Sequence, residues 1–281
     1  VGLARKLGAD VVLGLAAGGG LRSEWIHTTD ADAALPPDYF QRVSEGEAPG
    51  EVGAVTYPFR HRLEGTAAER RALAEYDEYL RYYVAGLAYA RSSYAHFSIG
   101  STVAFRASHY AGVRGFPKRA AGEDFHFLNK VAKVARIRSL GGAPLVLSGR
   151  CSTRTPFGTG AQVLEGSRSE TGRRVMAPAA FNALRTVLSI LRKEVDTVQA
   201  RREVRAAGPW GEAVDGFLEG AAVWDAHGRK GGRVPFWERQ LDGLRTLQLL
   251  RLLGEAGANP VTLVDARRLA QFRWDHAPQG A

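Results

Sequence analysis

Short apolar runs alternate with helix-like stretches along the first half of the chain. Residues 1–15 combine alanine, leucine and basic residues in a helix-like order, and residues 67–92 are rich in the helix formers Ala, Glu, Arg and Leu. Apolar and β-branched runs at 25–29, 51–58 and 99–106 are typical of buried strands. Strands that alternate with helices predict an α/β fold, in which helices flank a sheet.

The pattern changes after residue 178, where amphipathic helices follow one another with Gly or Pro between them. The four helical stretches are 181–205, 210–227, 235–253 and 260–274. We therefore expect an α/β domain over residues 1–160 and an α-helical carboxyl-terminal region over residues 161–281.

Five tyrosines recur at spacings of three, four and seven within residues 67–92, which places several of them on one helix face. They are Tyr76, Tyr79, Tyr82, Tyr83 and Tyr89. The spacing favours a stripe that packs against the core. The alternative is an aromatic platform for a sugar acceptor.

Composition and charge narrow the classes of partner. The 281 residues are 45% hydrophobic and 24% charged, which is ordinary for a globular protein large enough to bury a sizeable core. A formal net charge of +9 favours anionic partners such as nucleotide diphosphates or anionic lipid headgroups. Nucleic acid is not expected, because zinc-finger spacing, an RNA-binding aromatic motif and a basic tail are all missing. The single cysteine, Cys151, excludes an internal disulfide and a cysteine-rich metal site.

The sequence predicts a cytoplasmic protein. No run reaches the roughly 18–20 apolar residues that span a bilayer, and the first residues lack the layout of a signal peptide. Peripheral contact with an anionic membrane surface is one interpretation of the basic residues within 181–205, and a solvated helix face is the other. These basic residues are Arg192, Lys193, Arg201, Arg202 and Arg205.

Two carboxylates follow the strand expected at residues 25–29. If strand alternation continues, Asp30 and Asp32 point the same way out of its carboxyl end, where open α/β sheets bind their ligands. Hard oxygen ligands suit Mg²⁺ or Mn²⁺, and phosphate oxygens and water would complete the coordination. This predicts a clamp for a metal ion and a diphosphate. In the alternative, Asp30 starts a turn and Asp32 caps a helix that Pro36-Pro37 opens.

Three further segments follow the Asp-Ala-Asp motif in a fixed order. They read IGSTVAFR at 99–106, HYAGVRGFP at 109–117 and GEDF at 122–125. Over about residues 1–150, the chain with these motifs resembles the family 2 glycosyltransferases of the GT-A fold. The resemblance implies a Rossmann-like mixed sheet flanked by helices. It also implies that the strands which hold the base and ribose in this family are missing before residue 1, so the GT-A-like domain is expected to be amino-terminally truncated.

The resemblance implies an activity and a role for the acidic residues. A sugar would move from a nucleotide-diphosphate sugar donor to the hydroxyl of a saccharide, lipid or other acceptor, with inversion at the anomeric carbon. Asp30 and Asp32 would hold Mg²⁺ or Mn²⁺, and Asp124 would act as general base on the acceptor hydroxyl. Glu123 would orient the acceptor or a loop. Helix capping is the alternative role for Glu123 and Asp124.

The remaining donor-binding residues are also implied by the resemblance. Arg5 would lie near the diphosphate, and Gly100 and Ser101 would pass close to the donor sugar. Arg154 or Arg150 would hold the departing nucleotide diphosphate with its fork of donors. A strand-edge bulge at Gly100 and a linker role for the Arg154 loop are the alternatives.

Two rival functions belong to other classes. A catalytically degenerate module would bind a nucleotide-sugar or a protein partner without turnover. A basic scaffold would bind nucleic acid or membrane without a metal, and its binding would fall steeply with salt.

Overall fold

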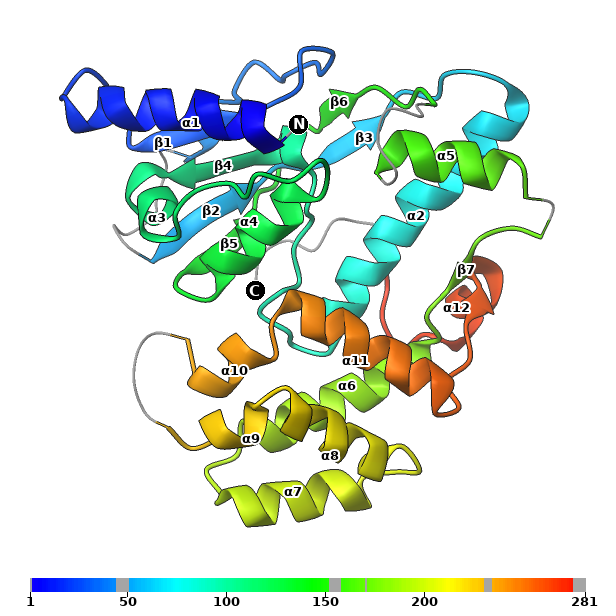
Figure 1. Ribbon diagram of the computed structural model, residues 1–281. Helices are drawn as coiled ribbons and strands as arrows, with labels where there is room; N and C mark the ends of the chain where they lie inside the picture. The colour runs from blue at the N-terminus through cyan, green and yellow to red at the C-terminus, as the bar shows by residue number, and fades with distance from the viewer. Residues whose placement is uncertain (1, 44–50, 152–157, 170, 230–233, 275–281) are drawn as a thin grey trace. The chain divides into compact units, whose positions relative to one another are not determined.

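The computed structural model describes residues 2–43, 51–151, 158–169, 171–229 and 234–274 (Figure 1). By the contacts between its residues, the chain forms two compact units. The first takes in the described residues of 1–80 and 96–173, and the second takes in those of 81–95 and 174–276. Residues after 160 and up to Arg173, which we expected in the carboxyl-terminal region, therefore group with the first unit.

A mixed four-stranded sheet forms the centre of the first unit. The strand order is β1-β4-β2-β5. Strand β4 pairs antiparallel with β1 and with β2, whereas β2 and β5 run parallel. The strands are Trp25–Thr28 (β1), Val52–Thr56 (β2), Val103–Arg106 (β4) and Arg136–Ser139 (β5). The expectation of an α/β fold with helices around a mixed sheet is confirmed.

The strands are shorter than the apolar runs that predicted them. Strand β1 ends at Thr28, and β2 ends at Thr56, before Pro58, which has no N–H to give to a ladder. A new strand, β3, covers Phe59–His61. The run at 99–106 becomes a strand only from Val103, because Gly100–Thr102 form a 3-10 turn, η2.

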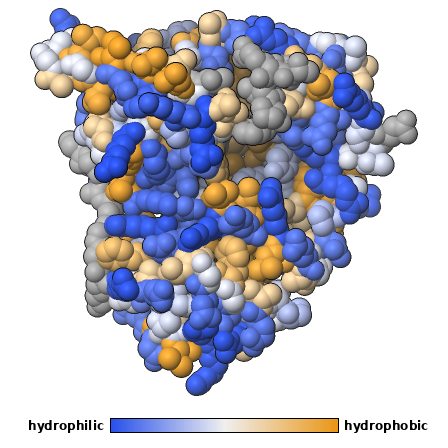
Figure 2. All heavy atoms as spheres, in the orientation of Figure 1, coloured by the Kyte–Doolittle hydropathy of each residue, from blue (hydrophilic) through white to orange (hydrophobic). Residues whose placement is uncertain are grey.

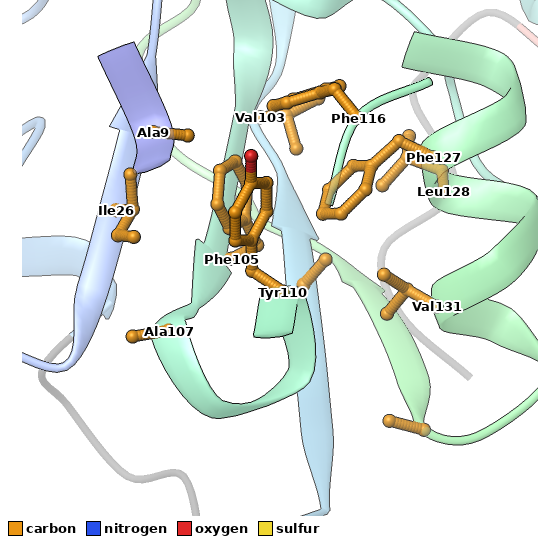
Figure 3. Packing of buried hydrophobic residues seen from close by; sticks show 12 residues of the cluster. Ala9, Ile26, Val103, Phe105, Ala107, Tyr110, Phe116, Phe127, Leu128 and Val131 are labelled. Atoms are coloured by element: carbon orange, nitrogen blue, oxygen red, sulfur yellow. The ribbon is translucent and has the colours of Figure 1, made fainter. Parts of the chain in front are cut away.

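Helices α1, α3 and α4 pack onto the sheet around one core cluster (Figure 3). They cover Gly2–Ala17 (α1), Ala107–Gly112 (α3) and Glu123–Ala132 (α4). Phe105 of β4 lies in this core, with the ring of Tyr110 stacked at 5.1 Å and the ring of Phe127 edge-on at 4.8 Å. Each fully buried side chain of this size contributes roughly 1.5–3 kcal/mol. The segments that carry the candidate site residues are thus fixed to a well-packed core.

Helix α1 is apolar on two sides. Ala9, Val12 and Leu13 face the core cluster. The outer side also exposes apolar residues at every fourth position, and Figure 2 shows a hydrophobic patch over this helix at the upper left. The exposed residues are Leu3, Leu7, Val11 and Leu15. The residue types at 1–15 predicted a helix, but because apolar residues lie on both of its sides, the pattern did not show which side is buried.

Two parallel strands and two helices complete the first unit. Strand β3 pairs with β6, Leu145–Leu147, and helix α5 covers Thr159–Ser167. Helix α2, Ala67–Tyr89, begins in the first unit and ends in the second. Its start is fixed by a capping box, since Glu69 accepts the Thr66 backbone N–H at 2.7 Å and the Thr66 hydroxyl accepts the Glu69 N–H at 3.3 Å. A short 3-10 helix, η1, covers Gln41–Val43.

The second unit is mainly helical, as expected, but its helices are shorter than predicted. The elements are Arg174–Val175 (β7), Pro178–Leu191 (α6), Thr197–Ala206 (α7), Gly211–Gly220 (α8), Val223–Ala226 (α9), Phe236–Gln240 (α10), Gly243–Glu255 (α11), Val261–Thr262 (β8) and Leu263–Leu269 (α12). The expectation of one helix at 181–205 is wrong, because Asp196 caps a new helix by accepting the Gln199 N–H at 2.8 Å. The stretch at 235–253 breaks in the same way at Asp242, which accepts the N–H groups of Leu244 and Arg245.

The tyrosine stripe of α2 contains packing residues. Tyr82 is fully buried in the second unit, where its ring contacts Phe181, Phe272 and Trp274. In the first unit, the Arg173 guanidinium lies over the rings of Tyr76 and Tyr79 at 5.3 and 5.5 Å. Packing is therefore confirmed for Tyr82.

Among the described residues, every helix is too short or too polar to cross a membrane.

Candidate active site

Arg5 of helix α1 joins four segments of the first unit. Its Nε donates to Glu123 Oε1 at 3.0 Å, and its Nη2 donates to Asp30 Oδ1 at 2.6 Å. Its Nη1 donates to the Gly100 carbonyl at 2.8 Å. The Arg5 side chain is 11% exposed and that of Glu123 5%, so the charge-assisted bond between them is shielded from water, whereas the bond to Asp30 is partly open to it. One guanidinium therefore brings together residues from α1, from the segment after β1, from η2 and from the start of α4.

Asp30 lies just after β1 and has both oxygens engaged. Oδ1 accepts from Arg5, and Oδ2 accepts from the Ser101 hydroxyl at 2.6 Å. The side chain is nevertheless 51% exposed. Because β1 ends at Thr28 and the Ala33 N–H donates to the Asp30 carbonyl at 3.1 Å, Asp30 begins a turn. The turn interpretation is thus confirmed for the backbone of Asp30, and strand alternation does not extend to the aspartates.

Asp32 is held separately from Asp30. Its Oδ2 pairs with Arg150 Nη2 at 3.0 Å, and its carbonyl accepts from Arg62 Nη2 at 3.3 Å. The side chain is 39% exposed. Residues Pro36 and Pro37 open no α-helix, so the alternative role of Asp32 as a helix cap is wrong. Each aspartate of the motif has its own arginine.

Gly100 and Ser101 connect the two acidic parts of the site. The Gly100 N–H donates to Asp124 Oδ2 at 2.8 Å, while its carbonyl accepts from Arg5 and from the Thr28 hydroxyl. A Cβ at Gly100 would lie 2.8 Å from Arg5 Cζ, so the guanidinium can approach only because this residue is glycine. The turn η2 is therefore shaped around Arg5, and the interpretation of Gly100 as a strand-edge bulge is wrong.

Glu123 and Asp124 open helix α4 after Gly122, whose φ of 71° suits glycine. Glu123 is buried and pairs with Arg5. Asp124 Oδ1 accepts the Phe125 N–H at 2.7 Å, so this carboxylate satisfies an amide of the first helical turn. The capping interpretation and a chemical role are compatible, because a carboxylate has about four lone-pair positions and only two are used here.

Among the carboxyl groups of the described residues, Asp124 has a markedly altered proton affinity. Burial, followed by the charge of Glu123, raises the pKa of Asp124 to about 6. The backbone N–H groups of Phe125 and Gly100 and the charge of Arg5 oppose this rise. A carboxyl group with a pKa near 6 is ionised at neutral pH but is a stronger base than an ordinary aspartate.

A groove lies beside this network, between helix α1 and strand β1. Its volume is about 510 Å³, and its lining includes Arg5 and Asp30 at one end. The volume falls in the range of about 300–1,000 Å³ that small-molecule sites occupy. The charged network thus borders a space that could hold part of a ligand.

The possible protein ligands for a metal ion here are Asp30 and Asp32, each of which already pairs with an arginine. Within the described ranges, no cluster of three or more His, Cys, Asp or Glu side chains could hold an ion without help. Asp30 and Asp32 are both partly exposed, and Mg²⁺ usually takes one or two carboxylates together with phosphate oxygens and water. These two side chains could hold Mg²⁺ or Mn²⁺ only together with such oxygens.

The structure brings together most of the residues that the sequence selected. Six of them form one hydrogen-bonded network, namely Arg5, Asp30, Gly100, Ser101, Glu123 and Asp124. Asp32 lies outside it, with Arg150. Arg154 lies outside the described residues. Sequence reasoning missed Thr28, whose hydroxyl donates to the Gly100 carbonyl, although a hydroxyl residue two positions before Asp30 was a usable signal.

Comparisons of the chain with protein-family models, with curated proteins and with solved structures find no match.

Proposed function

We propose that the first unit is the catalytic domain of an inverting glycosyltransferase with a GT-A-like fold. One observation carries the proposal: Arg5, Asp30 and Asp124, which are far apart along the chain, meet in one network beside a groove. The expected roles need this convergence, because the diphosphate and the acceptor hydroxyl must flank the same anomeric carbon. Had Asp124 been separated from Asp30, the roles could not have been combined.

Asp124 is the proposed general base. The acceptor hydroxyl gives its proton to the Asp124 carboxylate while its oxygen attacks the anomeric carbon. The bond from that carbon to the diphosphate oxygen breaks, and the diphosphate leaves with the electron pair. The Gly100 and Phe125 N–H groups hold the Asp124 carboxylate in one orientation, which supports a positioned base.

The donor diphosphate is proposed to lie at Asp30 and Asp32. The guanidiniums of Arg5 and Arg150, which bind these aspartates, would lie close to it. A bound Mg²⁺ or Mn²⁺ would supply Lewis acidity toward the leaving group. Ser101 holds Asp30 from the other side and so sets the direction of its carboxylate.

Donor hydrolysis and sugar transfer with added Mn²⁺ test the proposal. We expect Asp124→Asn to lower the rate by about a hundredfold or more, because general-base catalysis contributes about 10²–10⁴. Asp30→Ala and Asp32→Ala should also reduce turnover. Asp38→Asn is the matched control, because Asp38 is 50% exposed, much as Asp30 is, and pairs with Arg42 outside the network. The control should keep the wild-type rate, and if the three variants of Asp124, Asp30 and Asp32 also keep it, the proposal is wrong.

A second candidate is a binding module without turnover. It is favoured by one observation, namely that Arg5 and Ser101 already occupy both oxygens of Asp30. If this candidate is right, calorimetry shows Mn²⁺-dependent binding of a nucleoside diphosphate, and neither the wild type nor an Asp124 variant forms product.

A further inference from the structure

Asp77, His61 and Thr159 form a chain of hydrogen bonds in the first unit, outside the six-residue network around Arg5. His61 Nδ1 and Asp77 Oδ1 lie 2.6 Å apart, and His61 Nε2 and Thr159 Oγ1 lie 3.4 Å apart. The three residues come from strand β3, helix α2 and the start of helix α5, which lie together at the upper right of Figure 1. A carboxylate, an imidazole and a hydroxyl in this order are the components of a nucleophilic triad.

The aspartate fixes which nitrogen of His61 carries the proton. An ionised carboxylate can only accept, so Asp77 takes the Nδ1–H of a neutral His61. The lone pair of Nε2 is then directed at the Thr159 hydroxyl, which donates to it. The distance of 3.4 Å is longer than a tight hydrogen bond, as is common for a catalytic pair in the absence of substrate. His61 is therefore oriented as a general base toward Thr159.

Exposure to water differs along this chain of residues. The His61 side chain is 1% exposed and that of Asp77 is 13% exposed, whereas Thr159 is half-buried beside the exposed Gly158. Strand β3 turns Phe59 and His61 to the same buried face, and their rings meet edge-on with centroids 5.5 Å apart. The base is thus held in place and shielded, and the hydroxyl lies where a reagent can reach it.

Thr159 is the first residue of helix α5. The first N–H to be bonded within the helix is that of Gln162, which donates to the Gly158 carbonyl at 3.0 Å. The N–H groups of residues 159–161 therefore have no acceptor inside the helix. Such a helix start favours negative charge, and a carbonyl oxygen becomes negative when a hydroxyl attacks its carbon. The position of Thr159 therefore suits attack on a carbonyl group.

A second contact between a threonine and a buried histidine lacks the aspartate. Thr197 is also the first residue of its helix, α7, and its Oγ1 lies 3.3 Å from Nδ1 of the buried His227. Within the part of the chain that the structure describes, no carboxylate bonds to His227. Asp196 caps helix α7 instead. Thr197 therefore matches Thr159 in its helix position and its imidazole, but not in the group that orients the imidazole.

We infer that Thr159 is a nucleophile that takes an acyl group from carboxylic esters, with His61 as general base and Asp77 as the residue that positions it. This activity is independent of the proposed sugar transfer. The Thr159 oxygen bonds to the ester carbonyl carbon while its proton passes to His61 Nε2. The bond from that carbon to the alcohol oxygen then breaks, and this oxygen takes the proton from His61. Water attacks the threonine ester in the same way, which releases the acid and restores the hydroxyl.

The test uses the full chain and p-nitrophenyl acetate, whose leaving group is coloured. We expect release of p-nitrophenolate, and peptide mass spectrometry should find the acetyl group on Thr159. Thr159→Val replaces the hydroxyl by a methyl group of similar size. It should lower the rate by about a hundredfold or more, because general-base catalysis contributes about 10²–10⁴. Thr159→Ser keeps a hydroxyl and should keep most of the rate.

Asp77→Asn tests the positioning of the base. Its amide can donate as well as accept, so it no longer fixes the tautomer of His61, and the rate should fall by about tenfold or more. Thr197→Ala is the matched control and should react as the wild type does. Circular dichroism checks that each variant is folded. Equal rates for Thr159→Val and the wild type, acetyl groups only on other residues, or no release above that without protein would overturn the inference.

Discussion

Two clusters of arginine and carboxylate, one in each unit, differ in which groups contact the buried aspartate. In the second unit, the buried Asp215 accepts hydrogen bonds from two arginines, Arg201 at 3.0 Å from both Nε and Nη2 and Arg205 at 2.8 Å from Nε. In the first unit, a single guanidinium, that of Arg5, serves both Asp30 and Glu123. Asp124 receives only backbone N–H groups.

These contacts decide the proton affinity of each buried aspartate. Burial alone would raise the pKa of Asp215, but the hydrogen bonds and charges of Arg201 and Arg205 outweigh it and lower the pKa. At Asp124, burial and the charge of Glu123 prevail, and the pKa rises to about 6. An aspartate that arginines contact directly forms a structural ion pair with a lowered pKa, whereas a buried aspartate that receives only backbone N–H groups beside another carboxylate has a raised pKa.

The largest expected effect is the loss of the structural cluster. Asp215→Ala leaves Arg201 and Arg205 without their shared partner, and breaking a buried pair costs about 3–5 kcal/mol. We expect about 3 kcal/mol, the low end, because the two arginine side chains are 27% and 47% exposed and regain water. Urea denaturation measures the loss. Unchanged stability would show that Asp215 does not anchor α7 to α8.

Next in size is the pH dependence that Asp124 introduces. The folded protein retains this proton up to about pH 6, whereas an ordinary aspartate has a pKa of 3.8. The folded state thus binds more protons between these values, so the free energy of unfolding falls as pH rises through this range. Turnover should rise over the same range, reaching about a tenth of its plateau one pH unit below the pKa. Thermal melts and rates from pH 4 to 8 measure both.

The variant Asp124→Asn sharpens this test. It has no titrating group at the position, so its melting temperature should lack the fall between pH 4 and 6 that the wild type shows. Asp215→Asn is the counterpart, because the pKa of Asp215 is lowered and its stabilisation is lost only as the solution becomes acidic. Identical pH curves for Asp124→Asn and the wild type would contradict the raised pKa.

The smallest effect is expected from Ser101→Ala. The variant removes one hydrogen bond to Asp30 Oδ2 and leaves the partner exposed to water, so stability should fall by only about 0.5–1.5 kcal/mol. Turnover should fall more than stability does, because the Asp30 carboxylate loses its fixed direction. Equal turnover in Ser101→Ala and the wild type would show that the orientation of Asp30 is unimportant.

The sequence predicted the elements better than their ends. The apolar runs located β1, β2 and β4, and periodicity located the helices, because both signals come from local burial. The breaks at Asp196 and Asp242 depend on single capping side chains, which periodicity does not register. An aspartate within a helix-like stretch can be the N-cap of a new helix, so both residues were recognisable as possible helix starts.

The candidate site was predicted in its members but not in its contacts. The order of motifs selected Arg5, Asp30 and Asp124, but nothing in their spacing reveals that Arg5 pairs with Glu123. Such a contact depends on how helices pack on a sheet, which is a property of the whole unit. The sequence also did not reveal that Asp32 pairs with Arg150 apart from Asp30. Strand β1 ends at Thr28, so the alternation of side chains does not fix where the two aspartates point.

The central claim is tested most directly by proton NMR. The spectra give the anomeric configuration of the sugar that the protein releases or transfers from a nucleotide-sugar in the presence of Mn²⁺. A single displacement assisted by Asp124 predicts inversion as the first product forms, and no detectable product over the same time from Asp124→Asn. Retention of configuration, or product formed equally by the variant, would contradict the account.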